Sequence, residues 1–327
     1  MADEAMEKRK PDFEIRTDLA LEERESFPGD GGEIRGVSLR EWRENGSDIR
    51  MTEVKILDGN GERAMGKPRG TYLTLEADRL RQKDEEYHRE AAVQLAGQIR
   101  RLLAGMTGRT EWSILTAGLG NSQVTPDALG PEVAGRLRVT RHLEGQYGTG
   151  FCRRRGLPVL SGIVPGVMAQ TGMETAEILK GIIRETKPDV LIAVDALAAR
   201  SIRRLGTTIQ LTDTGIHPGS GVGNHRHSLT EESLGIPVLA IGVPTVVGAA
   251  AIVHDTADAM IRALWDSTAG GGIGGFLQKL DSEEQYDLIR ELLEPEFGSL
   301  YVTPPDIDET IRLLGQTISD GIHRALF

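Results

Sequence analysis

Five short apolar runs, each followed by a glycine-rich or polar loop, constrain the fold of this chain more than any other feature. They are WSILTAGLGN, PVLSGIVPG, DVLIAVDALAA, TIQLTDTG and PVLAIGVPTVV, and they lie between residues 112 and 247. Strands that are apolar along their whole length are typical of a sheet that helices cover on both faces. The sequence therefore predicts an α/β fold with a mainly parallel sheet, and 327 residues are enough for one large domain of this kind.

A small β-rich region is expected before these runs. MTEVKI and GTYLTLE alternate polar and apolar residues like half-buried strands, and residues 58–61 between them have the composition of a hairpin turn. Apolar residues at helical spacing then predict a long helix over about residues 85–103, and a Pro-Pro entry before Asp306 predicts a helix near the end of the chain. Residues 267–298 are rich in glycine and then acidic, and we expect a flexible excursion there rather than a domain boundary.

The charge balance limits the possible partners. The 49 acidic and 38 basic residues give a net charge of −11, which repels nucleic-acid backbones and anionic membranes. No apolar run reaches the roughly 20 residues needed to span a bilayer, and the first residues lack the apolar stretch of a secretion signal. A single cysteine, Cys152, excludes an intramolecular disulfide and fits a reducing compartment. We therefore expect a soluble cytoplasmic protein that binds neither nucleic acid nor membranes.

Two aspartates stand where sheets of this type place their functional sites, just beyond the carboxyl ends of strands. Asp127 follows the first run and its glycine loop, and Asp195 ends the predicted strand DVLIAVD. Each has a structural alternative, because Asp after Pro is common in turns and Asp195 could cap a helix that begins near Ala196. Two carboxylates that converge on one crevice can instead share a proton and do acid–base work on a bound water.

Two glycine-rich loops near these aspartates are candidates for holding substrate backbone. As nucleotide signatures they have little specificity, because no Lys-Ser/Thr pair follows and no strand–GxGxxG–helix unit is present. The candidate substrate-binding residues are Gly118, Gly120, Asn121, Gly219, Ser220, Gly221, Gly223 and Asn224. His217, His225 and His227 could ligate a metal, but their spacing matches no standard ligand pattern. We expect no metal and no other cofactor.

Residues 16–25, RTDLALEERE, follow a charged tail and have two interpretations. As a helix opening, Thr17 or Asp18 would cap the helix, and Glu22 and Glu23 would stabilise its positive end. As a cleavage peptide, the segment would offer an acid, a large apolar residue and a small residue in that order, next to a tail that can reach a cleft. The composition of the segment alone leaves both interpretations open.

Taken together, the motifs resemble the germination protease family, the endopeptidases of spore-forming bacteria that degrade small acid-soluble spore proteins. The likeness is carried by IRTDLALE, TEVKI, GKPRGTYLTLE, ILTAGLGNSQVTPDALGP, YGTGF, LSGIVPGVMAQTGMET, VLIAVDALAAR, TIQLTDTGIHPGSGVGN and VTPPDID. Their order and spacing, rather than any one motif, make the resemblance specific. The family is similar in core fold to hydrogenase maturation proteases, which share a G-x-G-N loop with an aspartate six residues after the Asn, here Asp127.

The resemblance implies an endopeptidase zymogen that assembles as a homotetramer, cuts its own amino terminus and acts in the spore core. It assigns the catalytic pair to Asp127 and Asp195. It also implies cleavage between Asp18 and Leu19, because residues 17–22 match the family's cleavage sequence of hydroxyl, acid, large apolar residue, alanine, variable residue and acid. Residues 1–18 would then be a propeptide, and residues 19–327 a single catalytic domain.

Two other functions fit the same residues. The first is a metal-dependent maturation protease that uses Asp195 and a histidine such as His217. In the hydrogenase proteases an acidic residue directly after the loop aspartate contributes to a metal site, and here that position is Ala128, which argues against a metal. The second is an inactive protein of the same fold that binds a partner. Both aspartates and the cleavable segment are present, which argues against lost catalysis.

Overall fold

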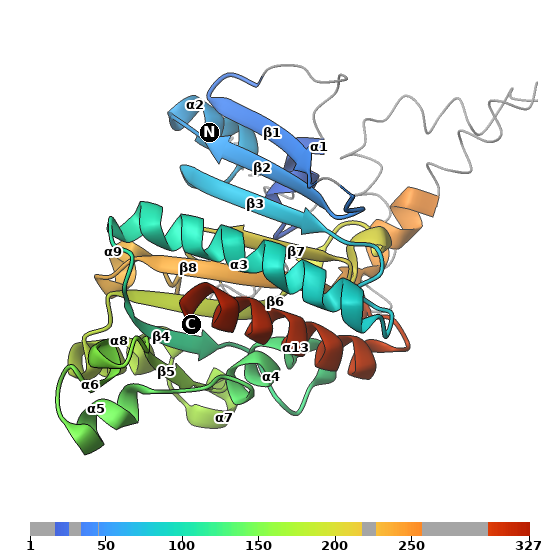
Figure 1. Cartoon of the computed structure of the whole chain (residues 1–327). Helices are drawn as coiled ribbons and strands as arrows, with labels where there is room; N and C mark the ends of the chain where they lie inside the picture. The colour runs from blue at the N-terminus through green and yellow to red at the C-terminus, as the bar shows by residue number, and fades with distance from the viewer. Residues whose placement is uncertain (1–16, 26–33, 45, 218–226, 257–299) are drawn as a thin grey trace, which may run out of the picture.

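The computed structural model describes residues 17–25, 34–44, 46–217, 227–256 and 300–327 (Figure 1). Most of the expected propeptide, the glycine loop of residues 219–224 and the expected excursion of residues 267–298 lie outside the described residues. Within the described part of the chain, nine strands form one sheet, and helices lie on both of its faces.

The sheet has the strand order β1-β2-β3-β7-β8-β6-β4-β5, with β9 paired to β8. Strands β8, β6, β4 and β5 run parallel to one another, whereas β1, β2, β3 and β7 are joined by antiparallel pairings. The strands are β1 Val37–Arg43, β2 Arg50–Ile56, β3 Gly70–Glu76, β4 Ser113–Gly118, β5 Val159–Ile163, β6 Val190–Ala199, β7 Thr208–Thr212, β8 Val238–Gly248 and β9 Tyr301–Val302. The predicted α/β class is confirmed, and the expected amino-terminal β region continues the same sheet.

The amino-terminal strands form where the alternation predicted them, but their connection differs. β2 and β3 contain MTEVKI and GTYLTLE and pair antiparallel, as the strands of a hairpin would. The predicted turn at residues 58–61 is wrong, because helix α2 (Gly59–Met65) begins there. The Asp58 carboxylate accepts hydrogen bonds from the backbone N–H groups of Asn60 and Gly61. A segment with the composition of a turn therefore begins a helix, and its first residue, Asp58, caps that helix.

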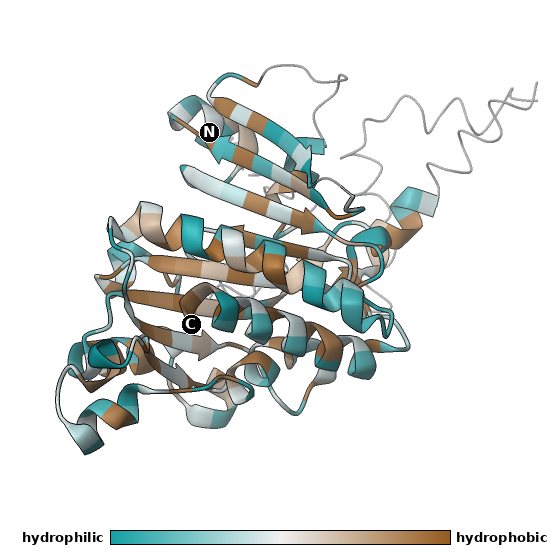
Figure 2. Cartoon of the chain, viewed as in Figure 1, coloured by the Kyte–Doolittle hydropathy of each residue, from teal (hydrophilic) through white to brown (hydrophobic). Residues whose placement is uncertain are grey.

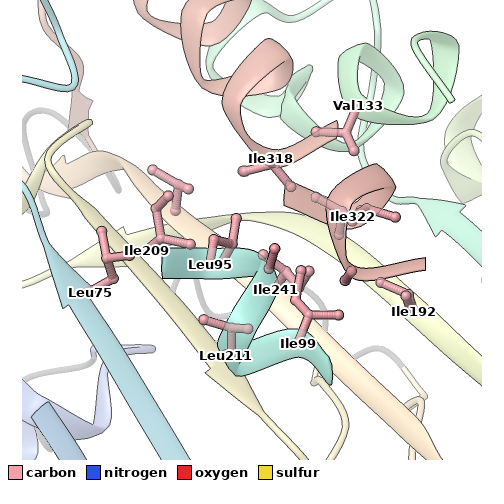
Figure 3. Packing of buried hydrophobic residues seen from close by; sticks show 14 of the residues in the cluster. Leu75, Leu95, Ile99, Val133, Ile192, Ile209, Leu211, Ile241, Ile318 and Ile322 are labelled. Carbon is pink, nitrogen blue, oxygen red and sulfur yellow. The ribbon is translucent and has the colours of Figure 1, made fainter. Parts of the chain in front are cut away.

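Two long helices, α3 and α13, cover one face of the sheet (Figure 1). α3 (Glu85–Thr107) contains the predicted long helix and ends at Gly108, whose left-handed backbone (φ 65°) stops it. α13 (Ile307–Leu326) follows Asp306, as predicted. Figure 3 shows how their buried side chains meet the strands in one cluster, with Leu95 and Ile99 from α3 and Ile318 and Ile322 from α13. Figure 2 shows apolar residues concentrated in the central strands and hydrophilic residues recurring along both helices.

A second apolar cluster lies on the opposite face of the sheet, under α8 (Thr175–Thr186) and α9 (Glu231–Leu234). Strand β6 shows how the two faces alternate. Leu191, Ala193 and Leu197 belong to the second cluster. Ile192 and Val194, which alternate with them, belong to the first. Asp195 continues the series of the second face, so its side chain lies on the side of α8 and α9.

The remaining helices of the described chain are short. They are α1 Ala20–Glu25, η1 Thr125–Asp127, α4 Leu129–Gly135, α5 Arg141–Tyr147, α6 Phe151–Arg154, α7 Met168–Thr171 and η2 Ile202–Arg204. A search of the described residues finds no helix with the length and apolar content needed to cross a bilayer.

Candidate active site

Asp127 closes a tight loop after strand β4. It is the last residue of η1, so the predicted Thr-Pro-Asp turn is a single turn of 3-10 helix. Its Oδ2 accepts a hydrogen bond from the backbone N–H of Asn121 at 2.7 Å. Gly120 has a left-handed backbone (φ 106°), and a Cβ at this position would overlap the Asp127 carbonyl oxygen. The glycine therefore lets the loop fold back onto Asp127 and hold its carboxylate.

Asp195 lies inside strand β6 rather than at its end. The strand continues to Ala199, so the predicted strand end and the helix cap considered for Asp195 are both wrong. Only 6% of Asp195 is exposed, and its Oδ1 accepts a hydrogen bond from the Ala196 N–H at 2.9 Å. The Val194 carbonyl accepts a hydrogen bond from the Leu119 N–H at 2.8 Å. This bond joins β6 to the loop that carries Asp127.

Both aspartates line one cavity of about 500 Å³. Asp18 and His217 line the same cavity. The other lining residues are Leu119, Gly120, Val124, Pro126, Thr175, Ala196, Leu197, Ala198, Ile216, Thr245, Val246, Tyr301 and Thr303. The structure thus brings two carboxylates from different elements to one space, as joint work on a bound water requires.

Asp18, which lines the cavity, belongs to residues 17–22, the segment with two interpretations. The Asp18 N–H donates to the Ala198 carbonyl at 3.1 Å, and the Asp18 carboxylate accepts from the Ala198 N–H at 2.9 Å. Leu19 and Ala20 are fully buried, and Leu19 belongs to the apolar cluster of the second face. The segment is therefore held along the end of β6 in the way that an extended peptide ligand is held by a strand.

Helix α1 begins immediately after this extended stretch. Glu22 and Glu23 lie in its first turn, and the Thr17 hydroxyl oxygen accepts a hydrogen bond from the Leu19 N–H at 3.1 Å. The helix of the helix-opening interpretation is therefore present, with Glu22 and Glu23 in its first turn, but the Asp18 carboxylate bonds the Ala198 N–H and the Thr17 hydroxyl bonds the Leu19 N–H, which precedes the helix. The helix does not decide against cleavage, because the bond between Asp18 and Leu19 precedes the first helical residue, Ala20.

The Glu22 carboxylate ties α1 to the connection after β6. It accepts hydrogen bonds from the backbone N–H groups of Arg200 at 2.8 Å and Ser201 at 3.0 Å, and from the Thr17 hydroxyl. Burial raises the pKa of Glu22, although these hydrogen bonds and the charge of Arg204 act in the opposite direction. Desolvation is thus the largest influence on this carboxylate.

Two side chains that the sequence analysis did not single out hold the backbone of the segment. Lys67 Nζ donates to the carbonyls of Thr17 and Asp18, both at 3.3 Å. Gln210 Nε2 donates to the Asp18 carbonyl at 3.1 Å, and Gln210 Oε1 accepts from the Ala20 N–H at 2.8 Å. The sequence carried a signal for Gln210, which is an amide inside an apolar run. Lys67 lies in GKPRGTYLTLE, one of the motifs that carry the resemblance, but its residue type predicts no contact with residues 17–22.

The described candidate residues of the first glycine loop have different places. Gly120 lines the cavity, whereas Gly118 packs so closely against Gly130 that a Cβ would overlap the Gly130 carbonyl. Asn121 Oδ1 accepts hydrogen bonds from the Gln123 N–H at 3.0 Å and from the Gln170 side chain at 2.8 Å. Gly118 and Asn121 therefore shape the loop that carries Asp127. The candidates at residues 219–224 lie outside the described residues.

His217 lines the cavity together with Asp18. Partial burial of the ring and the charge of Lys67 lower the pKa of His217, and the charge of Asp18 opposes them. The lowered pKa favours the uncharged ring. In the part of the chain that the structure describes, no group of three or more His, Cys, Asp or Glu side chains is arranged to hold a metal ion.

Comparison with known proteins bears on what this cavity does. A family model described as germination protease matches residues 13–272. The chain belongs to the germination protease family. Curated germination proteases are similar to it over nearly their whole length. That of Caldanaerobacter subterraneus subsp. tengcongensis is 48% identical over 95% of this chain and 94% of the relative, and that of Bacillus pumilus is 41% identical over 98% and 96%. The germination protease of Clostridium tetani is 42% identical over 95% of each chain.

The germination protease family makes this chain a protease, a hydrolase of peptide bonds. The matched residues include the docked segment and both aspartates of the cavity, and the resemblance noted from the motifs is confirmed. Among solved structures, a NiFe hydrogenase maturation protease, HycI from Thermococcus kodakarensis KOD1, is 23% identical over 45% of this chain and 80% of its own, with a TM-score of 0.29. That likeness is too slight to bear on the chemistry of this germination protease.

Proposed function

We propose that this germination protease is made as a zymogen, cuts its own chain between Asp18 and Leu19, and then degrades small acid-soluble spore proteins. One observation carries the proposal: Asp18 lines the same cavity as Asp127 and Asp195. The bond that the family's cleavage sequence selects therefore begins at a residue that borders the two carboxylates.

The contacts of residues 17–22 support the proposed cleavage sequence position by position. The Asp18 carboxylate meets the Ala198 N–H, which favours an acid before the bond. Leu19 and Ala20 are fully buried, which favours a large apolar residue and then a small one. The Glu22 carboxylate meets two backbone N–H groups, which favours a second acid. A substrate segment with the same sequence would find the same partners.

In the proposed mechanism, the two aspartates share the proton transfers of hydrolysis. One carboxylate accepts a proton from the attacking water, and the other, protonated, delivers a proton to the nitrogen of Leu19 as it leaves. The hydrogen bonds to the Asn121 and Ala196 N–H groups orient the Asp127 and Asp195 carboxylates, respectively. The mechanism uses neither a metal nor another cofactor.

The remaining parts of the proposal concern the setting of the enzyme. Residues 1–18 act as the propeptide and residues 19–327 as the catalytic domain, which works as a homotetramer in the spore core. Gly219, Ser220, Gly221, Gly223 and Asn224 help to hold substrate backbone. The net charge of −11 disfavours direct binding to DNA, so the partners are the spore proteins themselves.

Incubation of the purified full-length chain, followed by amino-terminal sequencing, tests the proposal. We expect a new terminus at Leu19, and then cleavage of an added small acid-soluble spore protein. A new terminus elsewhere, or a chain that stays intact while an added spore protein also stays intact, would contradict the proposal.

A parallel incubation with a chelator separates the aspartate mechanism from the metal-dependent alternative. If Asp127 and Asp195 act without a metal, cleavage at Leu19 continues at an unchanged rate after the protein has been dialysed against the chelator. Cleavage that stops on dialysis and returns with added zinc would favour the metal-dependent protease.

A further inference from the structure

The carbonyl oxygen of Asp18 has two side-chain donors. Gln210 Nε2 lies 3.1 Å from it and Lys67 Nζ lies 3.3 Å from it. One of the two donors is an amide and the other carries a positive charge. Peptide carbonyls held only for docking are commonly paired with backbone N–H groups, as in a strand. Here the backbone N–H of Ala198 bonds the Asp18 carboxylate, and two side chains donate to the carbonyl.

The Gln210 side chain hydrogen-bonds to the backbone on both sides of the proposed scissile bond. Its Oε1 accepts from the Ala20 N–H at 2.8 Å, so the amide is oriented with its NH₂ group toward the Asp18 carbonyl. The residue is 6% exposed and lies in the middle of β7. Gln210 and Asp195 both pair with Gly242 of β8, so they stand in one row across three strands. Gln210 is thus a buried donor in the same row as a candidate catalytic carboxylate, and it lines, with Lys67 and Asp18, a hollow of about 70 Å³. Asp18 also lines the cavity of the two aspartates.

Lys67 reaches the same carbonyl from another element. It follows Gly66, whose left-handed backbone (φ 58°) ends helix α2, and it precedes Pro68. The Pro68 carbonyl accepts a hydrogen bond from the Tyr72 hydroxyl at 2.8 Å, which anchors this connection to strand β3. The Nζ atom therefore reaches the carbonyls of Thr17 and Asp18 from an anchored backbone.

We propose that Lys67 and Gln210 form the oxyanion hole of this protease. The inference rests on the proposed cleavage between Asp18 and Leu19. Two donors aimed at a carbonyl oxygen stabilise the negative charge that forms there when water attacks, and fixed donors do so without reorganisation. The charge of Lys67 adds a Coulomb attraction that grows as the oxygen becomes an anion.

The chemical step balances without a proton from either donor. Water adds to the Asp18 carbonyl carbon and gives a proton to one aspartate carboxylate. A new C–O bond forms, and the π electron pair moves onto the oxygen that Lys67 and Gln210 hold. When this pair returns, the C–N bond breaks and its electrons go to the nitrogen of Leu19, which takes a proton from an aspartic acid. The products are the Asp18 carboxyl group and the Leu19 amine. A substrate in a second chain would place its own carbonyl between the same two donors.

The test compares the rate of self-cleavage in full-length variants. Lys67→Met removes the charge while keeping the length of the side chain, and we expect it to slow the appearance of the Leu19 terminus by about 10²- to 10³-fold, the usual effect of losing one oxyanion donor. Lys67→Arg keeps the charge and should recover most of the rate. Lys180→Met, the same change at an exposed lysine on α8, should cleave like the wild-type chain.

A second measurement separates catalysis from docking. In chains that also carry Asp195→Asn, hydrogen exchange at the α1 amides reports whether residues 17–25 stay docked. The inference predicts that Lys67→Met leaves this protection within about twofold of its parent while cleavage slows by the factor above. Protection that is lost together with the rate would overturn it, because Lys67 would then only hold the segment. A folded Lys67→Met chain that cleaves at half the wild-type rate or faster would overturn it as well.

The wild-type result distinguishes failure of this inference from failure of the proposed function. If the wild-type chain is never cut between Asp18 and Leu19, the proposed function is wrong, and the proposed oxyanion hole is wrong as well. If the wild-type chain is cut there and Lys67→Met is cut equally well, the proposed function stands and only the oxyanion hole is overturned.

Discussion

The parallel and antiparallel halves of the sheet contribute different parts of the site. The parallel half carries the carboxylates, with Asp127 after β4 and Asp195 in β6. The antiparallel half carries the side chains that hold the docked backbone, with Gln210 in β7 and Lys67 just before β3. The two halves meet at β8, which pairs parallel with β6 and antiparallel with β7.

The difference between the halves explains why a rule for parallel sheets located only part of the site. Functional residues at the carboxyl ends of parallel strands are a consequence of strand direction. An antiparallel strand has no such preferred end, and Gln210 acts from the middle of β7. Gly242 of β8 has no side chain, and the Leu197 side chain occupies the space where a Cβ would stand. Leu197 therefore packs on β8 at the row that joins Asp195 to Gln210.

The largest expected effect comes from the parallel half. Changing Asp195 to Asn keeps the shape of the side chain but removes its acid–base chemistry, so we expect self-cleavage to fall by at least about 10³-fold with the fold unchanged. Amino-terminal sequencing over time measures the rate, and thermal unfolding checks the fold. Asp127→Asn should have a similar effect, because the proposed mechanism uses the two carboxylates as a pair.

A matched control for this comparison is Asp78→Asn, at an exposed aspartate after β3. It should cleave like the wild-type chain. Near-normal cleavage by a folded Asp195→Asn chain would remove Asp195 from the mechanism, and with it the division of work between the two halves.

Sequence patterns were sufficient for the elements that have their own local signals. The apolar runs predicted the central strands, the alternation predicted β2 and β3, and Asp306 predicted the start of α13. The patterns failed where two structures share one composition. Residues 58–61 suit a hairpin turn and a capped helix equally, and the helix α2 forms because Asp58 can accept from two N–H groups at once.

Several residues that line the cavity were candidates from the sequence, namely Asp127, Asp195, Gly120, Asp18 and His217. The side chains that hold the docked backbone were not, because their contacts join distant segments. Lys67 acts through the carbonyl of a residue 49 positions earlier, and Gln210 through one 192 positions earlier. No local pattern encodes such a distance. Asp195 was singled out for its place at a predicted strand end, although β6 continues to Ala199 and the residue lies inside the strand. The burial of residues 17–22 could not be predicted either, since their composition suits an exposed helix opening.

A smaller effect is expected from a change in the docked segment itself, which both halves contact. Leu19 is fully buried among apolar side chains of the second face, and a lysine there would have to bring a charge into that cluster. A docking penalty of about 3 kcal/mol corresponds to roughly a 10²-fold slower self-cleavage for Leu19→Lys. Sequencing of the amino terminus after incubation measures it.

The Leu19→Lys chain also tests whether recognition and chemistry are separate. Because its aspartates are intact, a mature form of the variant, expressed from a later start, should still cut an added peptide with the wild-type sequence of residues 13–26. Leu57→Lys, at a leucine that is 55% exposed, is the matched control and should process normally. A Leu19→Lys chain that cuts itself at the wild-type rate would mean that the buried leucine does not select the bond.

The smallest expected effect comes from Glu22, which fastens α1 to the connection after β6 in the parallel half. Burial raises the pKa of Glu22 above its ordinary value of 4.5, so the docked segment takes up a proton more readily than the released segment. Docking is therefore favoured fully below pH 4.5 and weakens as the pH rises through the raised pKa of Glu22.

Hydrogen exchange at the α1 amides of the Asp195→Asn chain, corrected for intrinsic exchange, should show protection declining from pH 4.5 toward neutral pH. Glu22→Gln cannot take up this proton, so its protection should be independent of pH over the same range. Equal pH dependence in both chains would assign the effect to another group, and the contact of Glu22 with the Arg200 and Ser201 N–H groups would then be only structural.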